Sequence, residues 1–276
     1  MKQIVFIFCL TLSSLSCFAT AQYPDKLIYK GDTLPFFTHP DIELYDQDSN
    51  AINLFGDREV DVVTSCWRGY VAYWLIENSK LYLVRIESWD YRNDSMEADL
   101  KSLFGDKYIK GRVEADWVSG IYYAGIGKVV YYVHDANLSS YEYELQFKIK
   151  NGKIPFRQPS LFNNSKSIQN PYLFTPEGLW SYIYRNINWV ILPSLNDSTG
   201  LWIVCEFSAN KKGEMSNVKI LRSNSNNAAF DKELVRVIKT YPLMDAYYHH
   251  GKFRKIPFRM NIRFNNELKE KYYQKE

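Results

Sequence analysis

Hydrophobic and polar positions alternate most regularly between residues 201 and 264, near the carboxyl end of the chain. In residues 201–208, the side chains of Leu201, Ile203, Cys205 and Phe207 would share one face of a strand. A turn that contains Gly213 follows, and residues 218–222 again favour a strand. The two segments therefore predict a β-hairpin.

A helix and a final strand are predicted after this hairpin. The apolar side chains of the helix fall on one face, at Phe230, Leu234, Val237, Ile238 and Tyr241. Pro242 marks the end of that helix, because proline cannot continue the hydrogen-bond pattern. Residues 255–264 alternate once more and predict the last strand.

Residues 22–154 have the pattern of a separate, strand-rich domain. The clearest strands are expected at residues 70–76, 81–86, 111–117, 128–133 and 141–149. In residues 141–149 the odd positions are apolar and the even ones polar, Glu142 and Glu144 among them, which predicts one buried and one solvated face. A single short helix is expected after Asp94 and should end at Gly105.

The best domain boundary is the stretch 155–174, which is rich in Pro, Asn and Ser and is predicted to be a linker. Thr175, followed by a proline, is expected to cap the first helix of a second domain that extends to residue 264. Residues 265–276 are a charged tail, expected to form a solvated, frayed helix. The predicted fold class is α+β: an antiparallel β-rich domain, then a small module of helix, β-hairpin, helix and strand.

The amino terminus has the pattern of an export signal. Lys2 precedes an apolar run at residues 4–12, and small residues at 19–21 predict cleavage that leaves Gln22 first. The run is shorter than the ~20 residues that span a bilayer, so no transmembrane span is expected in the mature chain. Cys17 leaves a lipid-anchored form as an alternative, although leucine is missing three positions before it. The expected location is the periplasm or cell envelope of a Gram-negative bacterium.

Composition adds a charge asymmetry to this picture. Hydrophobic residues make up 46% of the chain, enough for sizeable cores, and the net charge of +3 gives no indication of nucleic-acid binding. Residues 22–150 contain 14 Lys and Arg against 21 Asp and Glu, a net charge of −7; residues 205–276 contain 15 against 8, a net charge of +7. This asymmetry indicates either a basic surface for an acidic partner or mutual attraction between two domains.

No set of residues has the spacing of a catalytic site. The densest chemical cluster in the first domain is a candidate surface site formed by Cys66, Trp67, Arg68 and Tyr70. A nucleophilic cysteine needs a base, and the spacing of His39 and His134 identifies neither as its partner. After cleavage Cys66 and Cys205 are the only cysteines, which is a poor disulfide framework.

Two further motifs contain residue types found in ligand sites, but we interpret both as turns. His249, His250 and Gly251 suggest a metal, but adjacent residues of an extended chain point in opposite directions. We therefore expect a turn there, with no metal site and no cofactor. Residues 122–127 contain two glycines without the strand, turn and helix of a nucleotide site, and predict a hairpin bend.

Residues 178–264 carry a family resemblance in an ordered set of motifs. These are Tyr182-Ile183, Val204-Cys205-Glu206-Phe207, Lys212-Gly213-Glu214, Val218-Lys219-Ile220-Leu221-Arg222-Ser223, Phe230-Asp231, Val237-Ile238-Lys239, Pro242, Gly251-Lys252, and Ile256-Pro257 followed by a strand to Phe264. In this order they resemble the TonB C-terminal-domain family. The family usually has a tryptophan and a second proline after Pro242, where this chain has Leu243-Met244-Asp245-Ala246. A cleavable signal and a folded domain also replace the family's inner-membrane helix and proline-rich spacer.

The resemblance implies a module that binds an extended segment of an outer-membrane receptor by strand addition. By resemblance, the pairing edge is the last strand, with Lys255, Phe258, Met260, Ile262 and Phe264 as partner-binding residues. The same alternation also fits a strand whose apolar side chains simply face the core.

The expected function is therefore that of an exported envelope protein with a protein-binding module. It is expected to be neither an energy transducer nor an enzyme, and its edge strands would also allow a dimer. The alternative is a secreted enzyme that acts on an envelope polymer through the first domain, using Cys66 or a carboxylate such as Asp116.

Overall fold

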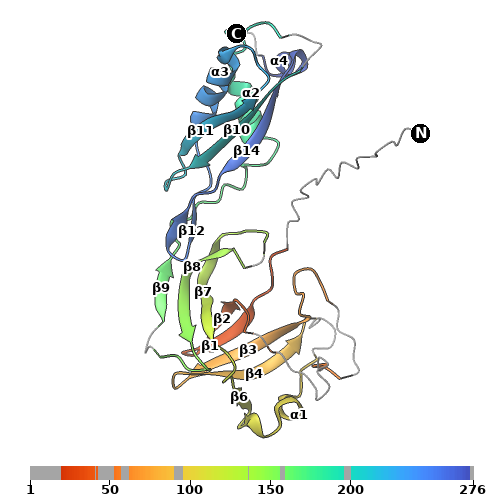
Figure 1. Ribbon diagram of the computed structural model, residues 1–276, viewed down its shortest axis with the longest axis vertical. Coiled ribbons are helices and arrows are strands. Elements are labelled where there is room, and N and C mark those ends of the chain that lie inside the picture. Colours follow the sequence, from red (N-terminus) through yellow and green to blue (C-terminus); the bar gives the residue numbers. More distant parts are fainter. Residues whose placement is uncertain are drawn as a thin grey trace, which may run out of the picture.

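The computed structural model describes residues 20–40, 42, 53–56, 62–89, 96–135, 137–155, 159–195 and 200–273. These residues form an elongated molecule, with a strand-rich first body at one end and a smaller α+β module at the other (Figure 1). Of the predicted signal, residues 1–21, the first nineteen, including Cys17, lie outside the described residues. Of the helices in the described ranges, none combines the length and apolar character needed to cross a bilayer.

The first body is built on one nine-stranded sheet. Its strands are β1 (Asp25–Tyr29), β2 (Asp32–Phe37), β3 (Tyr70–Glu77), β4 (Lys80–Ser88), β5 (Tyr108–Ile109), β6 (Arg112–Glu114), β7 (Gly120–Tyr131), β8 (Ser140–Ile149) and β9 (Ser160–Asn163). Their spatial order is β5-β6-β4-β3-β1-β2-β7-β8-β9.

Neighbouring strands of this sheet are antiparallel except β1 and β3, which are parallel. The prediction of a wholly antiparallel domain is therefore wrong at this pair. The reason is topological: the β1–β2 hairpin is inserted between β3 and β7, and a long connection allows β3 to run in the same direction as β1.

A single hydrophobic core fills the bend of this sheet. Strands from both halves contribute to it, including Leu27 of β1, Trp74 of β3 and Phe147 of β8, all of which are buried. Figure 1 shows β3 and β4 crossing the direction of β7 and β8, so that the two halves of the sheet face a common interior. Apolar side chains of both halves are thereby removed from water, which is the main stabilising contribution.

One short helix, α1 (Leu100–Phe104), followed by the 3-10 turn η1 (Gly105–Lys107), interrupts the strands. The expected cap, Asp94, lies outside the described residues, and Asp99 caps the helix instead. Its carboxylate accepts hydrogen bonds from the main-chain N–H groups of Lys101 and Ser102. These bonds satisfy donors that a helix leaves free at its amino end.

Residues 122–127 lie within β7, so the predicted hairpin bend is wrong. A Cβ at Gly125 would lie 2.5 Å from the ring of Tyr141 on β8, which makes glycine necessary for close packing rather than for a turn. Gly127 has a φ of +79° and lies at the irregular register between Ile126 and Val129. The glycines thus mark a β-bulge in a continuous strand.

The C-terminal module contains the predicted order of helix, hairpin, helix and strand. Its elements are α2 (Leu179–Asn186), β10 (Leu201–Ala209), β11 (Met215–Ser223), α3 (Ala228–Lys239), β14 (Phe258–Phe264) and α4 (Asn266–Tyr272). The sheet order is β11-β10-β14, and both pairs are antiparallel. The helical residues Leu179, Ile183, Leu234 and Val237 pack with the buried side of the sheet in one core.

Two boundaries of the module differ from prediction. Helix α2 begins at Leu179 after Gly178, whereas the side chain of Thr175 donates to the carbonyl of Tyr172 and caps no helix. A Cβ at Gly178 would lie 1.9 Å from that same carbonyl oxygen, so the tight turn requires glycine. Strand β14 begins at Phe258 rather than at residue 255, because the preceding proline has no N–H for the sheet.

A hairpin that the sequence did not reveal joins the module to the first body. It consists of β12 (Tyr247–His249) and β13 (Lys252–Arg254), and Figure 1 shows β12 at the narrow waist of the molecule. The predicted linker 155–174 also differs from expectation, because it contains β9, and its Ile168 forms an isolated bridge with Ala246 just before the hairpin. The waist is thus held by hydrogen-bonded strands.

The charged tail is docked rather than fully solvated. The ring of Tyr272 in α4 stacks on Tyr184 of α2 with 5.4 Å between ring centroids, and Leu268 packs against the module core. Asn265 caps α4 by accepting from the N–H of Leu268. The predicted helix is therefore confirmed, and its apolar contacts explain why it is attached to α2.

Candidate functional site

The outer edge of β14 is defined by the direction of its main-chain groups. On β10, the N–H of Trp202 donates to Asn224 at 2.7 Å and its carbonyl accepts from Asn224 at 3.2 Å, so both groups point toward β11. Trp202 is opposite Arg263, and the register between β10 and β14 has no shift. In such a ladder alternate residues face outward, so the main-chain groups of Arg259, Asn261 and Arg263 point away from β10.

Part of this edge is already occupied. The hydroxyl of Tyr184 lies 3.1 Å from the carbonyl oxygen and 3.3 Å from the nitrogen of Arg263, and so satisfies both main-chain groups. Among the described residues, no hydrogen bond from another segment reaches the outward main-chain groups of Arg259 or Asn261. The open part of the edge is therefore short and centred on these two residues.

The side chains that were expected to bind a partner belong mainly to the core. Met260, Ile262 and Phe264 are buried, and Phe258 is half-buried and stacks on Phe207. Lys255 is exposed and precedes the strand. The residues that sequence reasoning missed are the exposed alternates Arg259, Asn261 and Arg263. Their signal was present in the alternation, since residues between core positions must face the other side.

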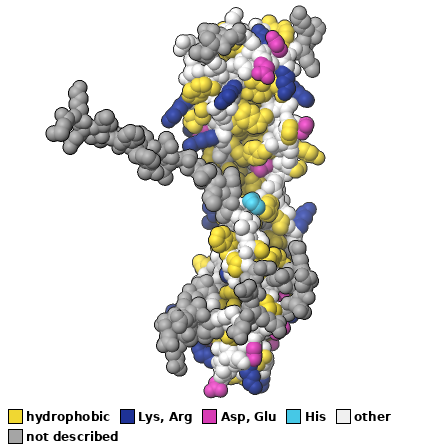
Figure 2. All heavy atoms as spheres, turned by 90° about the vertical axis from the view of Figure 1, so that its right-hand side faces the viewer, with side chains coloured by type: hydrophobic (Ala, Val, Ile, Leu, Met, Phe, Trp, Pro, Cys, Tyr) yellow, Lys and Arg dark blue, Asp and Glu magenta, His cyan; other side chains and the backbone are white. Residues whose placement is uncertain are grey.

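An apolar cleft of about 950 Å³ lies beside the beginning of β14. Its module side is lined by Phe174, Ile256 and Phe258, and its other side by residues 131–135 of the first body. The ring of Phe174 is 64% exposed and lies 5.7 Å from the ring of Phe258. Figure 2 shows hydrophobic side chains gathered on one face of the module, with Lys and Arg side chains around them.

The open face of the module sheet is basic. Its exposed cations are Lys219, Arg222, Arg259 and Arg263, and Arg259 donates to Glu206 at 2.8 Å. No Lys or Arg in the described part of the module forms an ion pair with an acidic residue of the first body. The opposite net charges of the two halves are therefore not neutralised by direct Lys or Arg pairs across the waist.

The predicted cluster around Cys66 is organised by a residue that the sequence did not reveal, Asp25. Its buried carboxylate accepts from Arg68 at 2.8 and 3.3 Å, from the N–H of Ala72 and from the indole of Trp74. Burial opposes ionisation, but the nearby His39 imidazole, 3.7 Å away, and the charge of Arg68 outweigh it and lower the pKa of Asp25. The partners lie far from Asp25 in sequence, so no local pattern indicated the network.

This environment gives Cys66 a structural role. Its thiol is buried and donates to the carbonyl of Tyr70, and burial raises the pKa of the thiol despite the nearby charge of Arg68. Trp67 is 68% exposed and turned to solvent. His134 contacts Tyr132 in the apolar cleft and is not part of this cluster. Cys66 and Cys205 are both free and lie in separate bodies.

A second buried carboxylate lies at the waist. Glu144 of β8 is only 1% exposed, which contradicts the prediction that its face of the strand is solvated. The β12–β13 hairpin covers it: the imidazole of His250 lies 2.7 Å from Glu144, and the N–H of His250 donates to the same oxygen at 3.3 Å. Polar residues of β8 are thus buried by a segment more than a hundred residues later in the chain.

The expected turn is confirmed, because His250 and Gly251 connect β12 to β13, but the two histidine rings lie together instead of pointing in opposite directions. His250 has a φ of +51°, so the chain turns between them and the ring centroids lie 3.8 Å apart. The ring of His250 also stacks on Tyr123 at 3.7 Å, while Nδ1 of His249 lies 3.0 Å from the hydroxyl of Ser140. Burial, together with the neighbouring His250, lowers the pKa of His249 to about 4.

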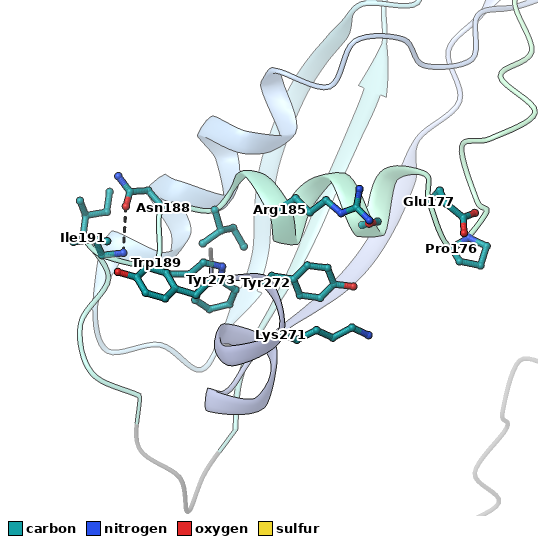
Figure 3. Close-up of a pocket in the computed structure, with 12 residues that line it drawn as sticks. Pro176, Glu177, Arg185, Asn188, Trp189, Ile191, Lys271, Tyr272 and Tyr273 are labelled. Carbon is teal, nitrogen blue, oxygen red and sulfur yellow. Dashed lines mark hydrogen bonds between the residues drawn. The ribbon is translucent and has the colours of Figure 1, made fainter. Parts of the chain in front are cut away.

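A pocket of about 1180 Å³ lies at the far end of the module, between α2 and α4 (Figure 3). Arg185 and Lys271 contribute positive charge to it, and Trp189 and Tyr272 contribute aromatic surface. Among its lining residues, the main-chain N–H of Val190 donates to the side chain of Asn188 at 3.2 Å, and the main-chain N–H of Trp189 donates to the carbonyl of Ile187 at 3.1 Å.

Comparison of the chain with models of protein families, with curated proteins and with solved structures finds no match in any of the three.

Proposed function

We propose that this is an exported cell-envelope protein whose C-terminal module binds a protein partner by adding a strand to β14. The carrying observation is the short open edge at Arg259 and Asn261. The sheet order β11-β10-β14 supports the proposal, because it leaves the last strand at an edge, as the resemblance to the TonB C-terminal-domain family requires. The module acts as a docking element and not as an energy transducer.

The free energy that the open edge of β14 can contribute limits the kind of partner that can bind there. Two open residues offer four main-chain groups, and each hydrogen bond contributes about 0.5–1.5 kcal/mol net. This alone is too little for stable association, because binding also costs translational and conformational entropy. The partner therefore needs apolar side chains for the cleft at Phe174 and Phe258, and acidic side chains for Arg259 and Arg263. An extended acidic segment with one or two aromatic or aliphatic residues satisfies these requirements.

The decisive experiment compares two substitutions at one position. Asn261→Pro removes the outward N–H while leaving the pairing with β10, because proline is tolerated where the N–H faces away from the ladder. Asn261→Ala removes only the side chain and is the matched control. We expect partner binding to weaken at least about tenfold in Asn261→Pro, the equivalent of about 1.4 kcal/mol, and to change little in Asn261→Ala.

The partner is captured by a photo-crosslinking amino acid at Arg259, with the same amino acid at Lys239 of α3 as the control. Crosslinks specific to residue 259 that disappear in Asn261→Pro would support strand addition, and crosslinks that persist would contradict it. Hydrogen exchange provides a reading that needs no substitution at the edge. The amides of residues 259 and 261 should exchange more slowly once the identified partner is bound.

Export is tested separately by sequencing the amino terminus of the protein recovered from the envelope. The proposal expects Gln22 as the first residue. A product that begins at Cys17 and incorporates a fatty-acid analogue would instead indicate a lipid anchor, and Cys17→Ala should abolish that labelling. Recovery of the protein with residues 1–21 intact in the cytoplasmic fraction would contradict export.

A further inference from the structure

We propose that Glu144, His249 and His250 form a binding site for a divalent transition-metal ion of the Zn²⁺ type at the waist of the molecule. These three residues are called the junction cluster below. The site is independent of the β14 edge, because its ligands come from β8 and from the β12–β13 hairpin.

The geometry brings three ligand atoms together. One carboxylate oxygen of Glu144 and one ring nitrogen of each histidine lie within 4.8 Å of one another. Ligand atoms around a tetrahedral Zn²⁺ with bonds of about 2.0–2.1 Å are about 3.3 Å apart, so the cluster must close by at most about 1.5 Å. Nδ1 of His250 lies 2.7 Å from a carboxylate oxygen of Glu144, so these two atoms would move apart by about 0.6 Å to hold the ion between them.

The donor set matches this class of ion. Two imidazoles and one carboxylate are ligands that suit Zn²⁺, whereas Ca²⁺ and Mg²⁺ favour sites made of oxygen atoms. Three protein ligands would leave one position of a tetrahedral ion for water or for a group supplied by another molecule. The cluster therefore has the composition of an open site rather than a closed structural one.

The burial of Glu144 is an independent observation that points to a cation. Its side chain is 2% exposed, and in the described residues no Lys or Arg forms an ion pair with it. Both recorded hydrogen bonds, from the main chain and the ring of His250, reach the same oxygen. A buried carboxylate with so little compensation is costly, and a metal ion would supply the missing positive charge.

The surrounding residues orient the ligands as metal sites require. Ser140 lies at hydrogen-bond distance from His249, and the ring of Tyr123 stacks on His250, so both imidazoles have fixed positions. The turn itself is held by Asn164, whose side chain accepts from the N–H of Gly251 at 2.8 Å. Such outer contacts typically increase metal affinity about 10–100-fold.

A metal ion here would join the two bodies. Glu144 belongs to the first body, and both histidines belong to the hairpin that precedes β14 in the chain. Occupancy would therefore add a bond across the waist and stabilise the docked arrangement of the hairpin on β8.

The test uses the mature chain, residues 22–276, with an affinity tag that contains no histidine and after removal of metal by a chelator. Zn²⁺ is added in equilibrium dialysis, and Co²⁺ is followed by its visible absorption. We expect one ion per chain with a dissociation constant below about 10 µM. Failure to bind one equivalent of either ion at this concentration would overturn the proposal.

Substitutions then locate the ion. His249→Gln, His250→Gln and Glu144→Gln should each weaken binding at least about tenfold, whereas the matched control His134→Gln should leave it unchanged. Circular dichroism verifies that each variant is folded. Binding that survives the three cluster substitutions, or that is lost in His134→Gln, would show that the ion is elsewhere and would contradict the proposal.

A spectroscopic reading requires no variant. The chain has four histidines, so nitrogen-detected NMR resolves each ring on addition of Zn²⁺. Shifts confined to His249 and His250 are the expected result. Shifts at His39 or His134 instead, or uniform broadening of all four rings, would overturn the assignment.

Discussion

Two buried carboxylates, one in each half of the strand-rich body, have their negative charge balanced by different kinds of partner. Asp25 is 0% exposed, and it accepts hydrogen bonds from a guanidinium, an indole and a main-chain N–H. Glu144 is 1% exposed, and all its recorded hydrogen bonds come from one histidine. The first has a permanent counter-charge within its own body. In the described residues, the carboxylate of Glu144 has only His250 as its hydrogen-bond partner. The charge of this imidazole depends on protonation, and the residue belongs to the β12–β13 hairpin rather than to the first body.

The comparison shows that burial alone does not define the role of a carboxylate. A guanidinium is always charged, so the Asp25 network is fixed under all physiological conditions. An imidazole can be neutral, protonated or metal-bound, so the surroundings of Glu144 can change state. We interpret Asp25 as an element of stability and Glu144 as an element of binding.

The largest expected effect is the loss of the Asp25 charge. Asp25→Asn should destabilise the first body by about 3–5 kcal/mol, because it leaves Arg68 buried beside an amide that can also point N–H groups toward it. Chemical denaturation gives the measurement, followed for this body by hydrogen exchange of the amides in β3 and β4, because tryptophans lie in both bodies. The exposed Asp32→Asn on β2 is the matched control and should differ little from the wild type. Equal stability of the two variants would refute the structural role of Asp25.

On acidification, the waist at Glu144 and the Asp25 network should lose stability at different pH values. The pKa of Asp25 is held below its ordinary 3.8, so its stabilising contribution is complete above that value and is lost as pH falls through the lower folded-state pKa. Burial lowers the pKa of His249 from 6.5 to about 4. As the pH falls below 6.5, His249 of the unfolded chain therefore binds a proton before His249 of the folded chain does. Acid thus favours release of the β12–β13 hairpin from β8 over this pH range.

Limited proteolysis of metal-free protein between pH 7 and pH 4 checks this order. Cleavage at the waist should increase before cleavage within the first body, and His249→Gln should flatten the pH dependence. Simultaneous loss of protection in both regions would show that the two sites do not differ in this way.

The isosteric change at the waist should have a much smaller effect than the one at Asp25. Glu144→Gln removes the charge but keeps an oxygen acceptor for His250, and no fixed cation is left without a partner. We expect metal-free protein to change by less than about 1.5 kcal/mol in its free energy of unfolding. Glu142→Gln, on the same strand, is the control. A loss as large as that of Asp25→Asn would remove the distinction between the two carboxylates.

The smallest effect is expected at Ser140. Ser140→Ala removes the hydroxyl beside Nδ1 of His249 and should cost only about 0.5 kcal/mol in the thermal unfolding of the waist, the low end for one hydrogen bond. In the presence of Zn²⁺ it should also weaken ion binding, since the ring loses its fixed orientation. The exposed Ser160→Ala on β9 should change neither quantity.

The sequence predicted the elements whose order is local. Helix α3 was evident because Phe230, Leu234 and Val237 recur at helical spacing, and the β10–β11 hairpin because a glycine turn separates two alternating runs. Residues 122–127 were misinterpreted, because glycine can be required by a neighbouring ring as well as by a turn. The ring was that of Tyr141, on the next strand.

The two carboxylate sites could not be predicted for a related reason. Asp25 meets Trp74 across 49 positions of the chain, and Glu144 meets His250 across 106. Alternation along β8 correctly placed Glu144 on the face opposite to Phe147, but it gave no sign that a later hairpin covers that face. The turn at His249-His250-Gly251 was predicted correctly, but the directions of the two rings were not, because the positive φ of His250 breaks the alternation of an extended chain.

The hydroxyl of Tyr184 on Arg263 has a kinetic consequence for the proposed docking strand. With Tyr184 at one end and Phe174 beside the other, an incoming strand has room for only a few main-chain bonds. Affinity differences between related complexes are expressed mostly in the dissociation rate, so a short ladder favours rapid release. Such an edge would suit a partner that is sampled repeatedly rather than held permanently.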